Sequence, residues 1–262
     1  NTLIAVPLFV MMGVMLEKTR LSQDLLESMA DLMTGIRSGL GLSVVLVGAL
    51  LAASTGIVGA TVVTMGLLSL PTLLKRGYSP SQATGMICAT GTLGQIIPPS
   101  IALVLLGDTL SSAYQQAQLT QGIFSPKTVS VGDLFLGAIV PGFALVTLYC
   151  IYLMAFTEQK IPELAETEYR KDRLKRALKN LVPPICLIFA VLGSILLGAA
   201  TPTEAAGVGA CGSLVLAVIK KQLTLQRLRD VVQSTTQVTS MVFLILIGAA
   251  VFSLVFRGFG GE

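Results

Sequence analysis

The stretch Gly91-Thr92-Leu93-Gly94-Gln95-Ile96-Ile97-Pro98-Pro99-Ser100 lies in the middle of an apolar run, residues 83–106, that is long enough to cross a membrane. Two successive prolines remove two backbone donors and disfavour helix at Ile97, and Gly91 and Gly94 weaken the preceding turn. An unaltered helix cannot continue through this stretch, so the sequence predicts two half-helices joined by an extended piece near the membrane midplane. The alternative is a continuous helix with a simple proline kink. Such a kink accounts for a single proline, but not for two glycines and two prolines in one stretch.

The composition of the whole chain indicates lipid as its main solvent. Of 262 residues, 53% are hydrophobic and only 12% are charged, whereas a soluble domain carries about a quarter charged residues. Together with its long apolar runs, this predicts an all-α polytopic membrane protein in contact with the lipid bilayer. The apolar runs cover residues 3–16, 40–74, 83–106, 134–156, 181–200, 205–219 and 238–256.

Several function classes are excluded by what the sequence lacks. The chain has no histidine, which excludes transition-metal sites built on imidazole and Ser-His nucleophile pairs. P-loop, HExxH and GxSxG motifs are also absent, so we predict no enzyme. The basic residues do not share a solvated face with stacking aromatic side chains, so no nucleic-acid partner is expected.

Basic residues predict how the chain is oriented in the membrane. They gather in the segment 157–179, at both ends of the run 40–74, and after the run 205–219, whereas the segment 111–132 holds only Lys127. The positive-inside rule places the basic clusters in the cytoplasm. The run 40–74 then starts and ends on one side, which predicts a re-entrant hairpin over 38–77. Two ordinary short spans satisfy the same topology.

Two further segments are amphipathic. Residues 20–37 place apolar side chains at helical spacing among acidic ones, which predicts a helix lying along the membrane interface. A shorter counterpart is expected at residues 223–232. An ordinary amphipathic connector is an equally good interpretation of both segments.

The middle of the 40–74 run holds a cluster of small and hydroxyl residues, 54–61, which becomes the tip of the predicted hairpin. A tip at membrane depth must turn, so carbonyls lose helical partners there, and glycines permit the turn. Carbonyls near Gly56 and Gly59 and the hydroxyls of Thr55 and Thr61 are therefore candidate ligands for a small cation such as Na⁺. Helix packing by small residues is the alternative interpretation.

The broken helix predicts that both an anionic substrate and a cation bind at the interruption. The N-terminus of a half-helix carries partial positive charge and suits an anionic substrate, whereas the carbonyls that end the first half suit a cation. Thr90, Thr92 and Pro98 are the candidate Na⁺ ligands of this stretch. The candidate substrate contacts are Gly91, Gly94, Gln95, Pro99 and Ser100.

A third motif, residues 198–207, predicts the start of a helix. Thr201 is the expected N-cap residue, and Pro202 is the expected first residue of the helix. Glu204 is then the third helical residue, so Thr201 and Glu204 can form a capping box. Ion or proton sensing by Glu204 near a membrane end is the alternative.

Taken together, these motifs resemble the large membrane (DctM-type) subunit of tripartite ATP-independent periplasmic (TRAP) transporters, within the ion transporter superfamily. The matching stretches are residues 4–13, the hairpin tip at Gly56, residues 94–101 and residues 201–206. The resemblance implies a Na⁺-coupled uptake of an organic acid, commonly a carboxylate, across the bacterial inner membrane. It further implies a small membrane (Q-type) subunit and a periplasmic substrate-binding protein as partners, and no cofactor besides Na⁺ as coupling ion.

The resemblance also implies a fold of two inverted repeats that move as an elevator. Residues 1–110 would form the first repeat, with an interfacial helix at 20–37, a re-entrant hairpin at 38–77 and a broken helix at 81–108. Residues 111–180 would hold a periplasmic loop, a connecting transmembrane helix and a basic cytoplasmic loop. Residues 181–262 would begin a second, truncated repeat, so we expect the chain to be a fragment.

The hairpin tip departs from the family pattern, which often reads Gly-Ile-Ser-Gly-Ser followed by an Asp. The corresponding positions here are Val58, Ala60 and Thr64, so the expected ligation would depend on backbone carbonyls and on Thr55 or Thr61. Two other functions stay open: a stand-alone Na⁺/carboxylate symporter of the same superfamily, and an ABC-type permease subunit or channel.

Overall fold

The computed structural model describes residues 2–19, 21–33, 35–36, 38–157 and 169–261, and within these residues it contains helices and connecting segments but no strand. This confirms the all-α prediction. The helices, in chain order, are η1 (Thr2–Ile4), α1 (Ala5–Lys18), α2 (Leu21–Leu32), α3 (Gly39–Thr55), α4 (Val58–Lys75), α5 (Pro80–Thr92), η2 (Leu93–Gln95), α6 (Ile101–Thr120), α7 (Val131–Phe156), α8 (Tyr169–Leu196), α9 (Pro202–Ile219) and α10 (Leu225–Gly258).

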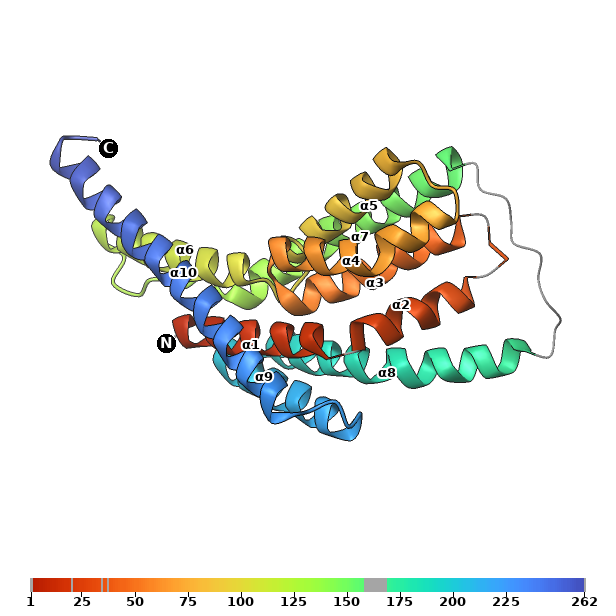
Figure 1. Cartoon of the computed structure of the whole chain (residues 1–262). Helices are drawn as coiled ribbons and strands as arrows, with labels where there is room; N and C mark the ends of the chain where they lie inside the picture. Colours follow the sequence, from red (N-terminus) through yellow and green to blue (C-terminus); the bar gives the residue numbers. More distant parts are fainter. Residues whose placement is uncertain (1, 20, 34, 37, 158–168, 262) are drawn as a thin grey trace.

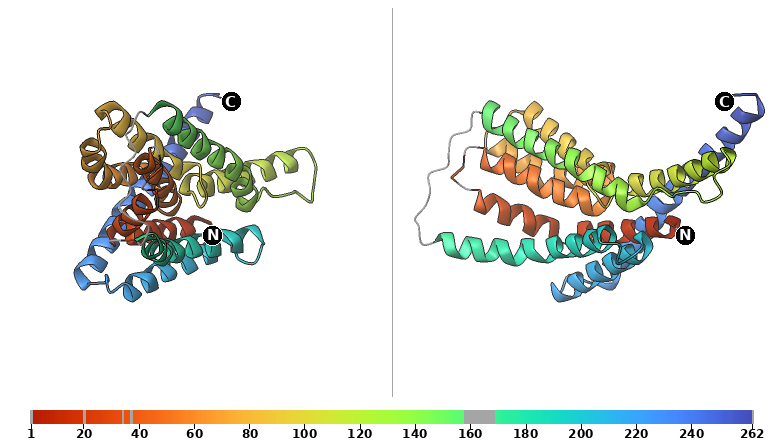
Figure 2. Two further views of the ribbon diagram at one scale, coloured as in Figure 1. Left: turned by 90° about the vertical axis from the view of Figure 1, so that its right-hand side faces the viewer. Right: turned by 180° about the vertical axis from the view of Figure 1, so that it is seen from behind.

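The helices form two layers, which Figures 1 and 2 show lying side by side along their length. One layer contains α3, α4, α5 and α7, and the other contains α1, α2, α8 and α9. Two apolar cores lie around α1 and around α3, and the core around α3 also includes Leu25 and Leu26 of α2. Helix α7 joins them, because Phe135 near its start packs into the core around α1, whereas Leu153 near its end packs into the core around α3.

Five helices in the described part of the chain are long and apolar enough to cross a membrane. They are Val58–Lys75, Val131–Phe156, Ala177–Leu196, Pro202–Ile219 and Leu225–Gly258. The C-terminal half of α10 extends away from both layers (Figure 1), and its large apolar side chains are exposed. Such a surface is expected where lipid replaces water around a multi-pass membrane protein.

Element boundaries differ from the sequence prediction in four places. The segment after the broken helix was expected to be a loop from residue 111, but α6 continues to Thr120, because this part of the chain has neither glycine nor proline. The buried Gln118 then closes the following turn through hydrogen bonds with the backbone N–H and carbonyl of Lys127, at 2.9 and 3.0 Å.

The other three differences concern α10, α8 and α2. The prediction of a separate amphipathic helix at 223–232 was wrong, because these residues belong to the long helix α10, Leu225–Gly258. This helix continues because it contains no proline and no glycine before Gly248. The basic segment 157–179 was expected to be a loop, but α8 already begins at Tyr169. The amphipathic helix predicted at 20–37 is shorter and covers Leu21–Leu32.

The start of α9 confirms the predicted capping box. The backbone N–H of Glu204 donates to the Thr201 hydroxyl at 3.4 Å, and the Thr201 N–H donates to the Glu204 carboxylate at 2.8 Å. This arrangement satisfies donors that a helix N-terminus would otherwise leave without partners.

Candidate functional site

Helices α3 and α4 form a helical hairpin whose tip consists of Gly56 and Ile57. Gly56 has φ of 60° and donates its N–H to the carbonyl of Ala52 at 3.0 Å, which ends α3. This left-handed conformation suits glycine, because other residues meet a steric cost there. Helix α4 starts at Val58, so the chain reverses direction within two residues.

The helix that follows the hairpin is interrupted, as the sequence predicted. Helix α5 ends at Thr92, a short 3₁₀ turn covers Leu93–Gln95, and α6 starts only at Ile101. Ser100 bridges the interruption: its hydroxyl donates to the Gln95 carbonyl at 2.9 Å and accepts the N–H of Leu103 at 3.4 Å. Ser100 therefore caps α6 and holds the preceding segment of turns and bends in place.

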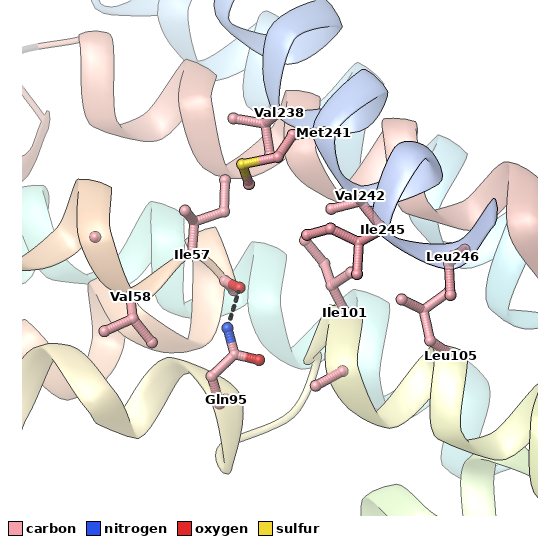
Figure 3. A pocket seen from close by; sticks show the side chains of 13 residues that line it. Ile57, Val58, Gln95, Ile101, Leu105, Val238, Met241, Val242, Ile245 and Leu246 are labelled. Atoms are coloured by element: carbon pink, nitrogen blue, oxygen red, sulfur yellow. Dashed lines mark hydrogen bonds between the residues drawn. The ribbon is translucent and has the colours of Figure 1, made fainter. Parts of the chain in front are cut away.

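One side chain ties this break to the hairpin tip. The Gln95 amide nitrogen donates to the Gly56 carbonyl at 2.9 Å (Figure 3), across 39 residues of sequence. The two segments are also closely packed. A Cβ on Gly94 would lie only 2.7 Å from the Ala52 carbonyl oxygen, too close for any side chain. A Cβ on Gly91 would likewise lie 2.3 Å from a methyl group of Val62. Both glycines therefore permit the close approach of the break to the hairpin.

A cavity of about 370 Å³ lies beside this contact. Its walls come from the hairpin tip, from the break and from α10, and only Gln95 contributes a polar side chain (Figure 3). The lining residues are Gly56, Ile57, Val58, Gly59, Gln95, Ile101, Ala102, Leu105, Val238, Met241, Val242, Ile245 and Leu246.

Two helix N-termini meet at the cavity. Helix α4 begins at Val58 and α6 begins at Ile101, and both residues line it. The N-cap position of α4 is Ile57, which makes no side-chain capping hydrogen bond. The first N–H groups of a helix have no intrahelical partner and carry partial positive charge, so this end of the cavity favours an anionic group.

The candidate residues divide between this cavity and other places. Gly56, Gly59 and Gln95 line the cavity, and Ser100 and Pro99 are buried in the break beside it. Pro98 is buried there as well. Gly91 and Gly94 contact the hairpin, as described above.

The candidate threonines lie away from the cavity lining. Thr90 is buried, donates to the Met86 carbonyl at 2.6 Å and packs against Gly48 of α3. Thr92 is exposed and donates to the Ala89 carbonyl at 2.7 Å. Thr61 is buried and lines a different, much smaller cavity. Thr55 is the last residue of α3, and its side chain lies outside the described part of the chain.

Two contributions escaped the sequence reasoning. Helix α10 supplies one wall of the cavity through Val238 and Met241, but its apolar and polar residues are not gathered on separate faces, so its sequence does not mark the side that faces a cavity. Glu17, near the end of α1, accepts a hydrogen bond of 2.5 Å from the Thr64 hydroxyl of α4. The sequence did contain a signal for this contact, because a carboxylate that directly follows the apolar run 3–16 needs a polar partner near the membrane.

The base of the hairpin is held by Tyr78. Ser38, the N-cap residue of α3, donates its hydroxyl to the Leu153 carbonyl at 3.1 Å and does not cap the helix. The Tyr78 hydroxyl accepts the Gly41 N–H at 3.0 Å instead. Burial raises the pKa of Tyr78 above its ordinary value, and the hydrogen bond from Gly41 opposes this shift only in part. The phenol therefore stays neutral at physiological pH.

Comparison with known proteins identifies the group to which these features belong. Residues 1–261 match the family described as "Tripartite ATP-independent periplasmic transporter, DctM component". The chain is 31% identical over 257 residues to the C4-dicarboxylate TRAP transporter large permease protein DctM of Pseudomonas aeruginosa, which covers 96% of this chain and 55% of that protein.

Relatives whose names specify other solutes match over a similar length. The sialic acid TRAP transporter large permease protein SiaM of Vibrio cholerae is 28% identical over 260 residues, covering 96% of this chain and 55% of that protein. The ectoine/5-hydroxyectoine TRAP transporter large permease protein UehC of Ruegeria pomeroyi is 28% identical over 258 residues, covering 97% and 55%. The chain thus spans about half the length of these curated relatives.

Proposed function

Because this chain belongs to the DctM family of TRAP transporter components, whose members are membrane permeases and not enzymes, we propose that it carries out Na⁺-coupled uptake of an organic acid. It acts as the large transmembrane subunit in the bacterial inner membrane. A periplasmic binding protein delivers the substrate, and a small membrane subunit completes the assembly. The names of two relatives specify organic acids, C4-dicarboxylate and sialic acid, which favours a carboxylate substrate here.

The observation that carries this proposal is the hydrogen bond from Gln95 to the Gly56 carbonyl, which joins the broken helix to the hairpin tip beside a cavity. At about 370 Å³, this cavity has the size of small-ligand sites. The N-termini of α4 and α6 favour a carboxylate at one end, and the apolar side chains of α10 suit a carbon skeleton.

In this proposal, Na⁺ binds at the same place. The carbonyls that end α3 and α5 lie next to the tip and the break, and hard cations prefer oxygen ligands. The C-terminal ends of these two helices carry partial negative charge, which complements a cation. A bound Na⁺ would also stabilise an approaching carboxylate, and this is the physical basis for coupling the two solutes.

The two layers support an elevator-type movement. In this proposal, α3 and α4 enter the membrane as a re-entrant hairpin and move together with α5 against the layer of α1, α8 and α9. Helices α3, α4 and α5 share one apolar core, whereas Ile57 at the tip and Ile101 after the break pack with the core around α1 and α9. Shared packing favours movement as one body.

The test is uptake by the full-length protein and its small membrane subunit in proteoliposomes. Labelled C4-dicarboxylates and sialic acid are offered with and without the purified binding protein, and with a Na⁺ or a K⁺ gradient. We expect uptake only when the binding protein and an inward Na⁺ gradient are both present. Na⁺-driven uptake without any binding protein would support the stand-alone symporter, and uptake that requires ATP would support an ABC-type permease.

A further inference from the structure

A groove of about 500 Å³ lies between α5 and α7, which both pack on α3. It shares no lining residue with the cavity beside the hairpin tip. Most of its lining side chains are apolar, and the polar Ser81 and Gln82 belong to the first turn of α5. The lining residues are Val45, Ser81, Gln82, Gly85, Met86, Ala89, Thr90, Leu148, Tyr149, Tyr152 and Leu153.

The groove is open to the surroundings of the protein. Leu148 and Tyr152 of α7 line it and are nevertheless exposed. Gly85 belongs to the α5 wall, and a Cβ at this position would meet no atom within 4 Å. Helix α7 is long and apolar enough to cross a membrane, so lipid is the solvent at the open side.

The width of the groove suits a hydrocarbon chain. From Ser81 to Thr90 helix α5 rises by about 13 Å, so a volume of about 500 Å³ corresponds to a mean cross-section of about 40 Å². An α-helix with its side chains is about 10–12 Å wide, which gives a cross-section of about 80 Å² or more. The groove therefore admits an acyl chain but not a further helix.

Positive charge gathers at one end of the groove. The start of α5 and the end of α7 lie at the same end of their layer (Figure 1). Lys75 and Arg76 are exposed there, and only four residues separate Arg76 from Ser81. Residues 32–107 contain three basic residues and no acidic one, and the N-terminus of α5 adds partial positive charge. This end, which the positive-inside rule places at the cytoplasmic surface, attracts an anionic headgroup.

We propose that the groove binds one acyl chain of an anionic phospholipid from the cytoplasmic leaflet. The phosphate group lies near the start of α5, close to Lys75 and Arg76. Tyr149 and Tyr152 flank the chain with amphipathic rings, which are common at membrane interfaces. The lipid fills space between α5 and α7 that no side chain of these helices occupies. This binding is independent of the contact between Gln95 and Gly56 and of the proposed transport function.

The experiment counts phospholipid on the purified full-length protein in detergent by native mass spectrometry. Phosphatidylglycerol is the anionic probe, and phosphatidylcholine is the zwitterionic comparison. We expect the wild type to retain one phosphatidylglycerol molecule that Gly85→Phe loses, because the aromatic ring occupies the groove. Lys75→Gln with Arg76→Gln should weaken phosphatidylglycerol binding by about thirtyfold and leave phosphatidylcholine binding unchanged.

Two matched controls separate the groove from the rest of the lipid-facing surface. Gly137→Phe makes the same substitution at an exposed glycine of α7 that also has open space around it and does not line the groove. Lys179→Gln with Arg229→Gln removes two exposed basic side chains from α8 and α10, on the same predicted side of the membrane. Both controls should retain phosphatidylglycerol like the wild type.

Three outcomes would overturn the proposal. One is unchanged phosphatidylglycerol binding in Gly85→Phe, and another is an equal loss of binding in both charge variants, which indicates attraction to the surface in general. The third is displacement of the lipid by the purified small membrane subunit together with weaker binding of that subunit to Gly85→Phe, since the groove would then be a protein interface.

A labelling experiment on the wild type keeps the proposal testable if Gly85→Phe does not fold. Phosphatidylglycerol that carries a diazirine in its acyl chain is cross-linked by light, and the labelled peptides are identified. Cross-links at residues 81–90 and 148–153 would support the proposal. Cross-links confined to the exposed apolar part of α10 would contradict it.

Discussion

At the scale of single residues, the candidate site depends on side chains that connect distant segments. Gln95 reaches the hairpin tip, Ser100 closes the break and Tyr78 caps the base of the hairpin. None of these residues is charged, so each acts through hydrogen bonds in surroundings where an unpaired polar group is costly. Substitutions that keep the size and remove the hydrogen bond are therefore the most informative tests.

Gln95→Leu should abolish or strongly reduce uptake while the protein still inserts. The leucine fills a similar volume but cannot donate to the Gly56 carbonyl, and the loss of one buried hydrogen bond costs about 1–3 kcal/mol. Uptake in proteoliposomes and the elution profile of the purified protein are the measurements. Gln116→Leu is the control, because Gln116 is exposed on α6. Wild-type uptake by Gln95→Leu would remove this contact from the transport site.

Tyr78→Phe should lower the stability of the hairpin by about 1 kcal/mol, because the Gly41 N–H loses its acceptor near the start of α3 while the ring stays packed. The change would be measured as a lower melting temperature in detergent. Tyr114→Phe is the comparison, since Tyr114 is exposed. Equal melting temperatures for the two variants would mean that the Tyr78 hydroxyl does not stabilise the hairpin.

At the scale of elements, the break between α5 and α6 cannot be explained by its prolines alone. Helix α8 contains Pro183 and Pro184, also in succession, and continues through both. The break differs because Gly91 and Gly94 precede its prolines and because Gln95 and Ser100 hold the non-helical segment with hydrogen bonds. Packing against Ala52 and Val62 then fixes this segment against the hairpin.

Replacing both prolines of the break should extend the helix and abolish transport. In Pro98→Ala with Pro99→Ala, two backbone donors return and the steric conflict with the preceding turn disappears, so helix becomes favourable by several kcal/mol locally. Uptake is the readout, and surface accessibility of tagged protein verifies insertion.

Pro183→Ala with Pro184→Ala is the matched control for this double variant. It makes the same chemical change in a helix that is already continuous, so it should retain uptake. If both double variants transport like the wild type, the interruption at Gly91–Ser100 is not part of the transport path.

At the scale of the whole molecule, a polar network connects the helices α2, α8 and α9. Asn180 of α8 donates to the Ser28 hydroxyl of α2 at 2.9 Å and accepts from Lys220, next to the end of α9, at 2.6 Å. Lys220 also lies 3.9 Å from Asp24 of α2. The network fixes the amphipathic helix α2 to the layer that contains α8 and α9.

Asn180→Ala should loosen α2 from this layer, because two hydrogen bonds are lost at once. We expect a loss of about 1–3 kcal/mol, which includes one bond to a charged group. Hydrogen exchange of the α2 amides should increase while exchange in α5 stays the same. Asp24→Asn is the milder comparison, because an exposed ion pair contributes at most about 1 kcal/mol. Unchanged exchange in α2 would show that apolar packing alone holds this helix.

The sequence by itself determined the features that act over a few residues. Composition determined an all-helical membrane protein, Gly56 determined the turn of the hairpin, and the Thr201 motif determined the start of α9. Each follows from backbone sterics, from local hydrogen bonds or from the cost of burying polar groups. The interruption at Gly91–Ser100 was also predicted, although its cause includes contacts that no local pattern contains.

Only the tertiary structure decided which way side chains face. It placed Thr90 against Gly48, joined Thr64 to Glu17 by a hydrogen bond, and made α10 a wall of the cavity beside the hairpin tip. The physical reason is that neither α3 nor α10 separates apolar from polar residues onto opposite faces, so their sequences do not mark an inward face. Which neighbour each side meets is decided by packing between segments that lie far apart in the chain.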